Sequence, residues 1–131
     1  MTPNTHLGID RRLCGEPVAL EPGRAVTQLR ATADMGTDDR GLVHGGFVFG
    51  LADHAAMLAV NDPFVVLGAA ETRFLAPVRV GDLVVATAVR AEQKGRKHVV
   101  TVEAHVGDLL VFSGTMTTFV LDQHVLDGRA G

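Results

Sequence analysis

A single carboxylate, Asp53, stands inside the most apolar segment of the chain, residues 41–60. The surrounding residues are mainly Phe, Val, Leu, Ala and Met, so a helix here has almost no polar face and is expected to be buried on most sides. Burying an unpaired carboxylate costs several kcal/mol or forces the group to take up a proton. We therefore interpret Asp53 as a candidate catalytic group; the alternative is a buried acid satisfied by a neighbouring hydroxyl or backbone group.

Helical spacing places Phe49, Ala56, Met57 and Val60 on the same face as Asp53. These apolar neighbours should desolvate the carboxylate, which raises its pKa and its basicity towards a bound water. Phe49 and Met57 are therefore candidate lining residues of a substrate pocket.

Gly45 and Gly46 come at the start of this helix, directly after His44. Backbone N–H groups at a helix start have no partner within the helix and favour negative charge, and glycine lets a ligand approach closely. The two glycines predict a site for a developing oxyanion; close helix packing is the alternative. His44 is a candidate acid or base, or a structural residue that holds the loop.

The spacing of these groups predicts a site shared by two copies of the chain. Asp53 follows Gly45 by eight residues, which is about 12 Å along a helix axis. One helix cannot easily bring both to one small carbonyl group. Two helices packed antiparallel across a dimer axis can, because each carboxylate then faces the glycines of the other chain.

The rest of the chain is expected to be mostly extended. Val18–Ala33 alternates and is broken by a turn at residues 21–23, a polar connector covers residues 34–40, and Pro63 ends the helix near Asn61. Short turns join the strands that follow, which predicts antiparallel neighbours. These strands are expected at residues 64–75, 83–92, 98–106 and 109–121, after a loosely ordered lead-in at residues 1–17 and before a frayed tail at residues 122–131.

This order predicts an α+β fold with one long central helix wrapped by a curved antiparallel sheet. A single helix that is apolar nearly all round needs a sheet that curls about it. The remaining apolar surface is most simply covered by a second copy of the chain.

Composition narrows the classes of function. A chain of 131 residues is one domain by ordinary size, and a formal charge of −3 gives no general attraction to nucleic acid or to an anionic membrane. One cysteine, Cys14, excludes an internal disulfide, and the six histidines lack zinc-ligand spacing, so no metal is expected. No signal peptide or membrane-spanning run is present in the sequence. We expect a cytoplasmic protein.

Two motifs resemble those of a known family. Residues 35–53 read MGTDDRGLVHGGFVFGLAD, and residues 73–82 read RFLAPVRVGD. A His-Gly-Gly with an acid eight residues past its first glycine, in front of a Phe-x-x-Pro strand, is similar to the PaaI-like group of hotdog-fold acyl-CoA thioesterases. The resemblance covers about residues 20–121 and implies a hotdog fold.

The resemblance also implies roles for particular residues. Gly45 would hold the thioester carbonyl oxygen through its backbone N–H, and Asp53 would act as general base on water or as nucleophile, with the two coming from opposite subunits. Two positions depart from the family. Asp38 stands where asparagine is frequent and cannot donate a hydrogen bond unless protonated. His54 stands where threonine or asparagine is frequent, and it would tune proton transfer or simply remain half-exposed.

Cations are the natural partners of coenzyme A phosphates. The turn at residues 94–98, which contains Arg96 and Lys97, is compact and basic in an otherwise acidic chain. A solvated hairpin tip is the alternative interpretation of this turn. Arg73, beside the Phe-x-x-Pro motif, is a weaker candidate.

The sequence thus predicts hydrolysis of an acyl-CoA thioester to a free acid and coenzyme A, with no resident cofactor. The expected assembly is a homodimer, and further a tetramer. Two alternatives stay open: a non-catalytic acyl-CoA-binding hotdog domain acting as sensor or regulator, and a hotdog hydratase. The acyl group is not predicted.

Overall fold

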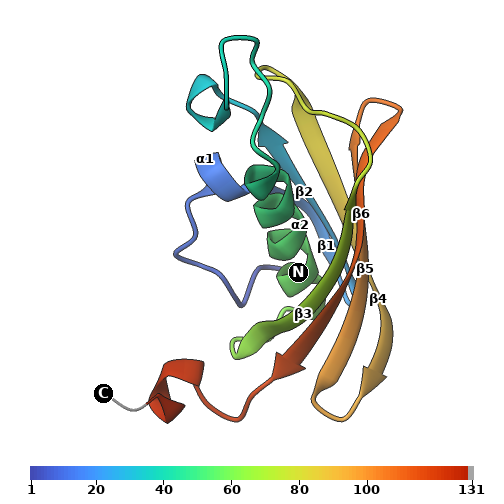
Figure 1. The fold of residues 1–131 in the computed structure, drawn as a ribbon. Coiled ribbons are helices and arrows are strands. Elements are labelled where there is room, and N and C mark those ends of the chain that lie inside the picture. The colour runs from blue at the N-terminus through green and yellow to red at the C-terminus, as the bar shows by residue number, and fades with distance from the viewer. Residues whose placement is uncertain (130–131) are drawn as a thin grey trace.

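The computed structural model describes residues 1–129, which form one antiparallel sheet of six strands around a long helix (Figure 1). In chain order the elements are α1 (Arg11–Cys14), β1 (Glu16–Glu21), β2 (Arg24–Arg30), η1 (Ala33–Met35), α2 (Gly45–Val60), β3 (Val65–Phe74), β4 (Leu83–Lys94), β5 (Lys97–Val106), β6 (Leu109–Val120) and η2 (Val125–Gly128). The strand order is β1-β2-β4-β5-β6-β3, so β1 and β3 are the edges. The predicted fold, a curved antiparallel sheet wrapped around one central helix, is confirmed.

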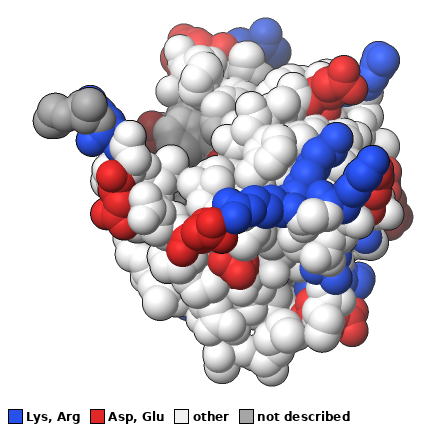
Figure 2. Space-filling model, turned by 90° about the horizontal axis from the view of Figure 1, so that it is seen from below, with Lys and Arg blue, Asp and Glu red and all other residues white. Residues whose placement is uncertain are grey.

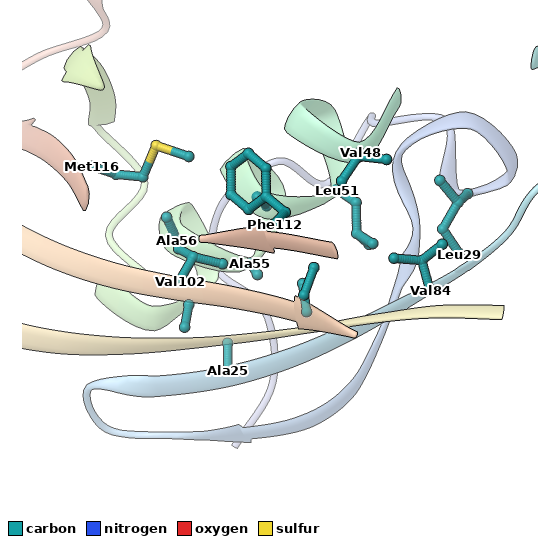
Figure 3. Packing of buried hydrophobic residues seen from close by; sticks show 14 of the residues in the cluster. Ala25, Leu29, Val48, Leu51, Ala55, Ala56, Val84, Val102, Phe112 and Met116 are labelled. Atoms are coloured by element: carbon teal, nitrogen blue, oxygen red, sulfur yellow. The ribbon is translucent and has the colours of Figure 1, made fainter. Parts of the chain in front are cut away.

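The helix α2 lies in the concave face of the sheet (Figure 1). Alternate residues of β4 and β5 are buried and point towards it, as the two-residue period of a strand requires. Small side chains let the helix approach closely: Ala52, Ala55 and Ala56 are fully buried. Figure 3 shows the resulting core, in which side chains of α2 meet those of the sheet; the labelled members include Leu51, Ala55, Ala56, Val84, Val102, Phe112 and Met116.

The helix ends where the sequence predicts. Asn61 adopts a left-handed conformation with φ 56° and ψ 37°, and its N–H donates to the carbonyl of Met57. Asparagine tolerates this conformation better than most residues, and Pro63 follows two positions later. The chain then enters β3, which carries it along the outer edge of the sheet.

The N-terminal lead-in differs from expectation, because residues 1–17 are not loosely ordered. They contain α1 and the start of β1, and the side chain of Asp10 caps α1 by accepting from the N–H of Arg12 at 2.9 Å. Gly15, at φ 89°, turns the chain from α1 into β1 directly over Leu51 of α2. The lead-in therefore packs on the side of α2 that faces away from the sheet (Figure 1).

The C-terminal tail also differs. Residues 125–128 form η2, and Nδ1 of His124 accepts from the N–H of Leu126 at 3.1 Å. Residues 130 and 131 of the expected frayed tail lie outside the described residues. The strands β4 and β5 are longer than predicted and leave only Gly95 and Arg96 as their turn, because Gly95 takes a positive φ of 60°.

Candidate active site

Asp53 lies in the wall of a cavity of about 400 Å³ at the junction of four segments. The N-terminal lead-in contributes Thr5 and His6, α2 contributes Asp53 and Met57, the start of β3 contributes apolar side chains, and the C-terminal tail contributes His124 and Val125. The full lining is Thr5, His6, Asp53, Met57, Pro63, Phe64, Val65, Val66, Leu67, His124 and Val125. Its size is within the range of small-molecule sites.

The Asp53 carboxylate is poorly solvated. Its Oδ1 atom is buried and accepts no hydrogen bond from any residue that the structure describes. Burial raises the pKa of Asp53 above its usual value, and the nearby His6 acts in the opposite direction. A desolvated carboxylate of this kind is a stronger base than one in water, and such groups concentrate at functional sites.

His6 is a site residue that the sequence did not indicate. It precedes Asp53 by 47 residues, in a stretch without periodicity, so no pattern connects the two. Its backbone is left-handed, with φ 55°, and its Nδ1 lies 2.9 Å from the hydroxyl of the buried Thr5. Burial lowers the pKa of His6, and the charge of Asp53 raises it.

His54 is buried rather than half-exposed, which corrects the expectation. Only 3% of it is accessible, because α1 covers this side of α2. Its Nδ1 lies 3.3 Å from the carbonyl oxygen of Cys14, and its ring stacks against that of His6 with 6.2 Å between centroids. Burial lowers the pKa of His54, although the Cys14 carbonyl raises it. His54 therefore holds the lead-in against the helix and lies behind His6.

The start of α2 faces a different cavity. Gly45 is the first residue of the helix and, with Phe74 and Val78, lines a hollow of about 360 Å³ that does not include Asp53. A methyl group on Gly45 would lie 3.2 Å from the ring of Phe74. Within residues 1–129, no protein oxygen accepts from the N–H groups of Gly45 or Gly46. These amides are therefore available to an anion.

His44 and Asp38 hold the loop before the helix. His44 occupies the N-cap position without a side-chain cap, its N–H donates to the carbonyl of Met35, and its exposed ring lies edge-on to Phe47. Oδ1 of Asp38 accepts from the N–H groups of Arg40 and Leu42 at 3.0 and 3.2 Å. Asp38 is exposed and lines neither cavity. Within one protomer its carboxylate therefore stabilises the loop before the helix.

The remaining predicted residues are dispersed. Met57 lies in the wall of the Asp53 cavity, whereas Phe49 is half-buried against the core outside it. Arg73 is exposed and lines a polar hollow between β3, β5 and β6. Lys97 is exposed at the start of β5, and the exposed Arg96 forms an ion pair with Asp122. One protomer therefore unites Asp53 and Met57 but separates them from Gly45 and the basic turn.

The edge strand β3 and the residues at its ends expose apolar surface. Phe74 is 55% exposed and Leu75 49% exposed, and Phe64, just before the strand, is 37% exposed. A ten-residue edge strand offers unpaired backbone groups to another strand, which natural proteins usually cover. This edge begins beside the Asp53 cavity and ends beside Gly45, since Phe64 and Phe74 line the two cavities.

The part of the chain that the structure describes offers no metal-binding cluster and no membrane-spanning helix. No group of three or more His, Cys, Asp or Glu side chains in this part of the chain has the geometry to hold a metal ion. Among the helices of residues 1–129, none has the length and apolar character needed to span a membrane.

A protein-family model matches more than half of the chain. The model of the Thioesterase superfamily matches residues 40–113, a stretch that contains α2 and strands β3 to β5. Both sequence motifs that resemble the PaaI-like group fall wholly or mainly inside it.

Curated relatives are similar over nearly the whole chain but are themselves longer. Methylthioribose-1-phosphate isomerase of Aquifex aeolicus is 48% identical over 123 residues, which cover 93% of this chain and 27% of that protein. Transcription factor FapR of a Thermoanaerobacter species is 32% identical over 117 residues, covering 88% of this chain and 58% of that protein. The chain thus spans little more than a quarter of the first relative and somewhat over half of the second.

Solved structures share the fold. An uncharacterized protein from Pyrococcus horikoshii is 47% identical, with a TM-score of 0.96 over 97% of this chain and 98% of that chain. A variant of the phenylacetic acid degradation protein PaaI from Thermus thermophilus is 33% identical, with a TM-score of 0.76 over 83% and 95% of the two chains. Both likenesses extend over more than four fifths of this chain.

Proposed function

Because this chain belongs to the Thioesterase superfamily as a PaaI-like hotdog protein, we propose that it hydrolyses an acyl-CoA thioester to a free acid and coenzyme A. The observation that carries the proposal is the unpartnered carboxylate of Asp53 in a cavity with mainly apolar walls. Asp53 is half-buried, and a carboxylate oxygen that is buried without a partner is costly to a fold. Such a cost is typically kept where the group performs chemistry.

The proposed reaction uses water and groups of this chain. Asp53 takes a proton from a water molecule, whose oxygen bonds to the thioester carbonyl carbon. The carbonyl oxygen becomes negative and is held by the N–H of Gly45, assisted by the adjacent Gly46 and by the positive end of α2. The carbon–sulfur bond then breaks, and the proton held by Asp53 passes to the coenzyme A sulfur. No metal or redox cofactor enters this scheme.

We place each reaction centre between two protomers. Gly45 and Asp53 line separate cavities of one chain and are about 12 Å apart along the axis of α2. Pairing of two β3 edges would cover the exposed Phe64 and Phe74 and bring one helix alongside the other. Each Asp53 would then face the Gly45 of the partner chain. A tetramer of two such dimers stays a prediction from the sequence.

The two halves of the substrate have separate places in this proposal. The acyl group occupies the Asp53 cavity, whose walls include Met57 and Val65. The phosphates of coenzyme A are attracted to Arg96 and Lys97 at the β4–β5 turn, and Arg73 is a weaker cationic candidate. Contacts of His44 and Asp38 with the substrate stay predictions from the sequence. In Figure 2, which shows the end of the molecule where this turn lies in Figure 1, basic side chains lie among acidic ones. Phosphate must therefore compete with Asp122 for Arg96.

A second candidate function is acyl-CoA binding without hydrolysis. The similarity to a protein named a transcription factor favours it, since the matched region is 58% of that relative. The isolated carboxylate of Asp53 favours the enzyme, because binding an apolar acyl group gains nothing from a buried acid. A hotdog hydratase is a weaker alternative, because the order of His44 and Asp53 follows the thioesterase motif.

The test is hydrolysis of a panel of acyl-CoA thioesters, measured by release of free thiol. Asp53→Asn keeps the shape of the side chain and removes the base, so its turnover should fall by about a hundredfold or more. If no thioester is cleaved while acyl-CoA still raises the melting temperature of both proteins, binding without catalysis replaces the proposal.

A further inference from the structure

We propose that His6 is a positioning residue for Asp53: its imidazole shares the cavity with the carboxylate and orients the water from which the carboxylate takes a proton. This inference rests on the proposed thioester hydrolysis. It assigns a function to the N-terminal lead-in, which neither sequence motif includes.

The lead-in is fixed to the far end of α2, so His6 has a defined place. The N–H of Asn4 donates to Oδ1 of Asn61 at 2.7 Å, and Nδ2 of Asn61 donates to the carbonyl of Thr2 at 3.1 Å. Asn61 is the residue that ends the helix, so this clamp couples the lead-in to the helix that carries Asp53.

The ring of His6 is oriented by its neighbours. The hydroxyl of Thr5, which is only 5% exposed, lies 2.9 Å from Nδ1 of His6 and leaves Nε2 as the free nitrogen. The His54 ring stacks behind that of His6 at an interplanar angle of 25°. Burial lowers the pKa of His54, and the charge of His6 lowers it too, so a proton on this ring pair is disfavoured on His54.

No hydrogen bond joins His6 to Asp53, although both side chains line the same cavity. We place a water molecule in this shared cavity, where it donates to Asp53 and is held by His6. Burial lowers the pKa of His6 and raises that of Asp53, and the two groups oppose these shifts in each other: the Asp53 charge raises the pKa of His6, and His6 lowers the pKa of Asp53.

This coupling answers a difficulty in the proposed chemistry. Burial alone raises the pKa of Asp53, and a carboxylate that is protonated at neutral pH cannot take a proton from water. Where His6 carries a proton, its charge favours the ionised carboxylate. Burial lowers the pKa of His6, so this support acts on the acidic side of the pH range and extends the range in which Asp53 is a base towards lower pH.

Other titratable groups surround the pair. His54 faces His6 from α2, and Cys14 and Arg11 approach from α1. Asp10 acts on Cys14, and His124 lines the same cavity from the C-terminal tail. A change in the pH dependence of the whole protein could come from any of these groups. The titration of the His6 ring must therefore be measured directly.

The kinetic test uses His6→Asn. Asparagine tolerates the left-handed backbone of His6 and can still bond to Thr5, but it does not titrate in this range. We expect kcat/KM at pH 6 to fall about tenfold, which is less than the hundredfold or more expected for loss of the base. The acidic limb of the pH profile should move to higher pH, because Asp53 loses the charge that keeps it ionised. His105→Gln, on β5 and outside the cavity, is the matched histidine control.

A second test does not depend on activity. Nuclear magnetic resonance can follow the titration of the His6 ring in the natural protein and in Asp53→Asn. We expect the pKa of His6 to fall in the variant, because the carboxylate charge that raises it is gone. Thr5→Val, which keeps the volume and removes the hydroxyl, should lower kcat/KM about threefold, since it loosens one hydrogen bond of the ring.

The outcomes separate the two proposals. A normal rate and an unmoved pH profile in His6→Asn, with Asp53→Asn inactive, overturn the role of His6 and leave the hydrolysis intact. An unchanged His6 titration in Asp53→Asn overturns the pairing whatever the activity. If no thioester is cleaved, the hydrolysis fails and the catalytic role of His6 fails with it, while the titration still decides whether the two groups are coupled.

Discussion

Gly45 and Asp53 lie eight residues apart on one helix, yet they line two different cavities of the chain. Phe64 and Phe74 lie at the two ends of the free edge strand β3. Phe64 lines the Asp53 cavity, and Phe74 lines the Gly45 cavity. A second chain paired along this edge in the antiparallel sense would reverse the order, so that the Gly45 end of one chain meets the Asp53 end of the other.

Complementation of inactive variants tests this arrangement. Gly45→Pro removes the N–H donor and is compatible with the helix, because proline is favoured at the first helical position and His44 already has the extended conformation that proline requires before it. Gly45→Pro and Asp53→Asn should each be inactive. When the two are unfolded together and refolded, half of the dimers are mixed and each has one intact site, so about a quarter of the natural activity should return.

Gly45→Ala controls for crowding, because it adds a similar contact with Phe74 and keeps the N–H. It should retain more activity than Gly45→Pro. Failure of the refolded mixture to regain activity, with mixed dimers detected by mass, would place both groups in one chain and contradict the shared site.

The carboxylate of Asp53 should cost the protein stability. Burial raises its pKa in the folded state, so the folded chain keeps the proton to higher pH than the unfolded chain does. Below the pKa of the unfolded state both forms are protonated and nothing is lost, whereas the penalty appears as the pH rises through the folded pKa. Asp53→Asn should therefore melt about 3–6 °C higher than the natural protein at pH 8, as expected for about 1 kcal/mol in a domain of this size.

The same comparison at pH 3 should show little difference, because the carboxylate is then largely protonated in both states. Melting curves at the two pH values, followed by circular dichroism, measure the effect. A natural protein that is more stable than Asp53→Asn at pH 8 would mean that the carboxylate has a stabilising partner, against the buried and unpartnered Oδ1.

The sequence was sufficient to predict the helix and the sheet because their signals are periodic. Alternation along residues 83–106 and the apolar run before Pro63 are strong local patterns, and the two-layer packing follows from them. Asp53 could be predicted as a site residue for the same reason, because its charge interrupts the apolar run of the helix. His6 was not found, because its role depends on a left-handed backbone and a clamp to Asn61, 55 residues later. Contacts of this kind leave no period in the sequence.

The burial of His54 also could not be predicted from local sequence patterns. A histidine next to a catalytic candidate on a helix was expected to be half-exposed, because nothing in residues 1–17 indicated an element that would cover it. The short helix α1 covers it, and that helix depends on one capping bond from Asp10 and on the positive φ of Gly15. A few residues with special backbone geometry therefore decide which side chains reach the Asp53 cavity.

Gly15→Ala tests how firmly the lead-in is docked. A Cβ atom there would lie 2.4 Å from a methyl carbon of Leu51 and 2.9 Å from the carbonyl oxygen of Gln28, at a φ that side chains disfavour. Because the Gln28 carbonyl is backbone and cannot move freely, we expect a loss of roughly 2 kcal/mol or more in the free energy of unfolding. Urea denaturation measures it. Gly8→Ala, which meets nothing within 4 Å, is the control and should change stability little.

Asp122 should compete with coenzyme A for Arg96. The two side chains form an exposed ion pair, which is typically worth no more than about 1 kcal/mol, so a phosphate group can displace the carboxylate. Asp122→Asn should therefore lower the KM for an acyl-CoA roughly twofold, and Arg96→Gln should raise it about three- to tenfold, with kcat nearly unchanged. Both effects should shrink at high salt.

The matched control is Arg12→Gln, which breaks a similar exposed pair with Asp34 near the opposite end of β4 and should leave KM unchanged. The same acyl group on a pantetheine thioester, which lacks the nucleotide phosphates, should show no difference between Arg96→Gln and the natural protein. An equal loss on both substrates would mean that Arg96 supports the β4–β5 turn, whose carbonyl at Arg96 accepts from the N–H of Val120, rather than the phosphates.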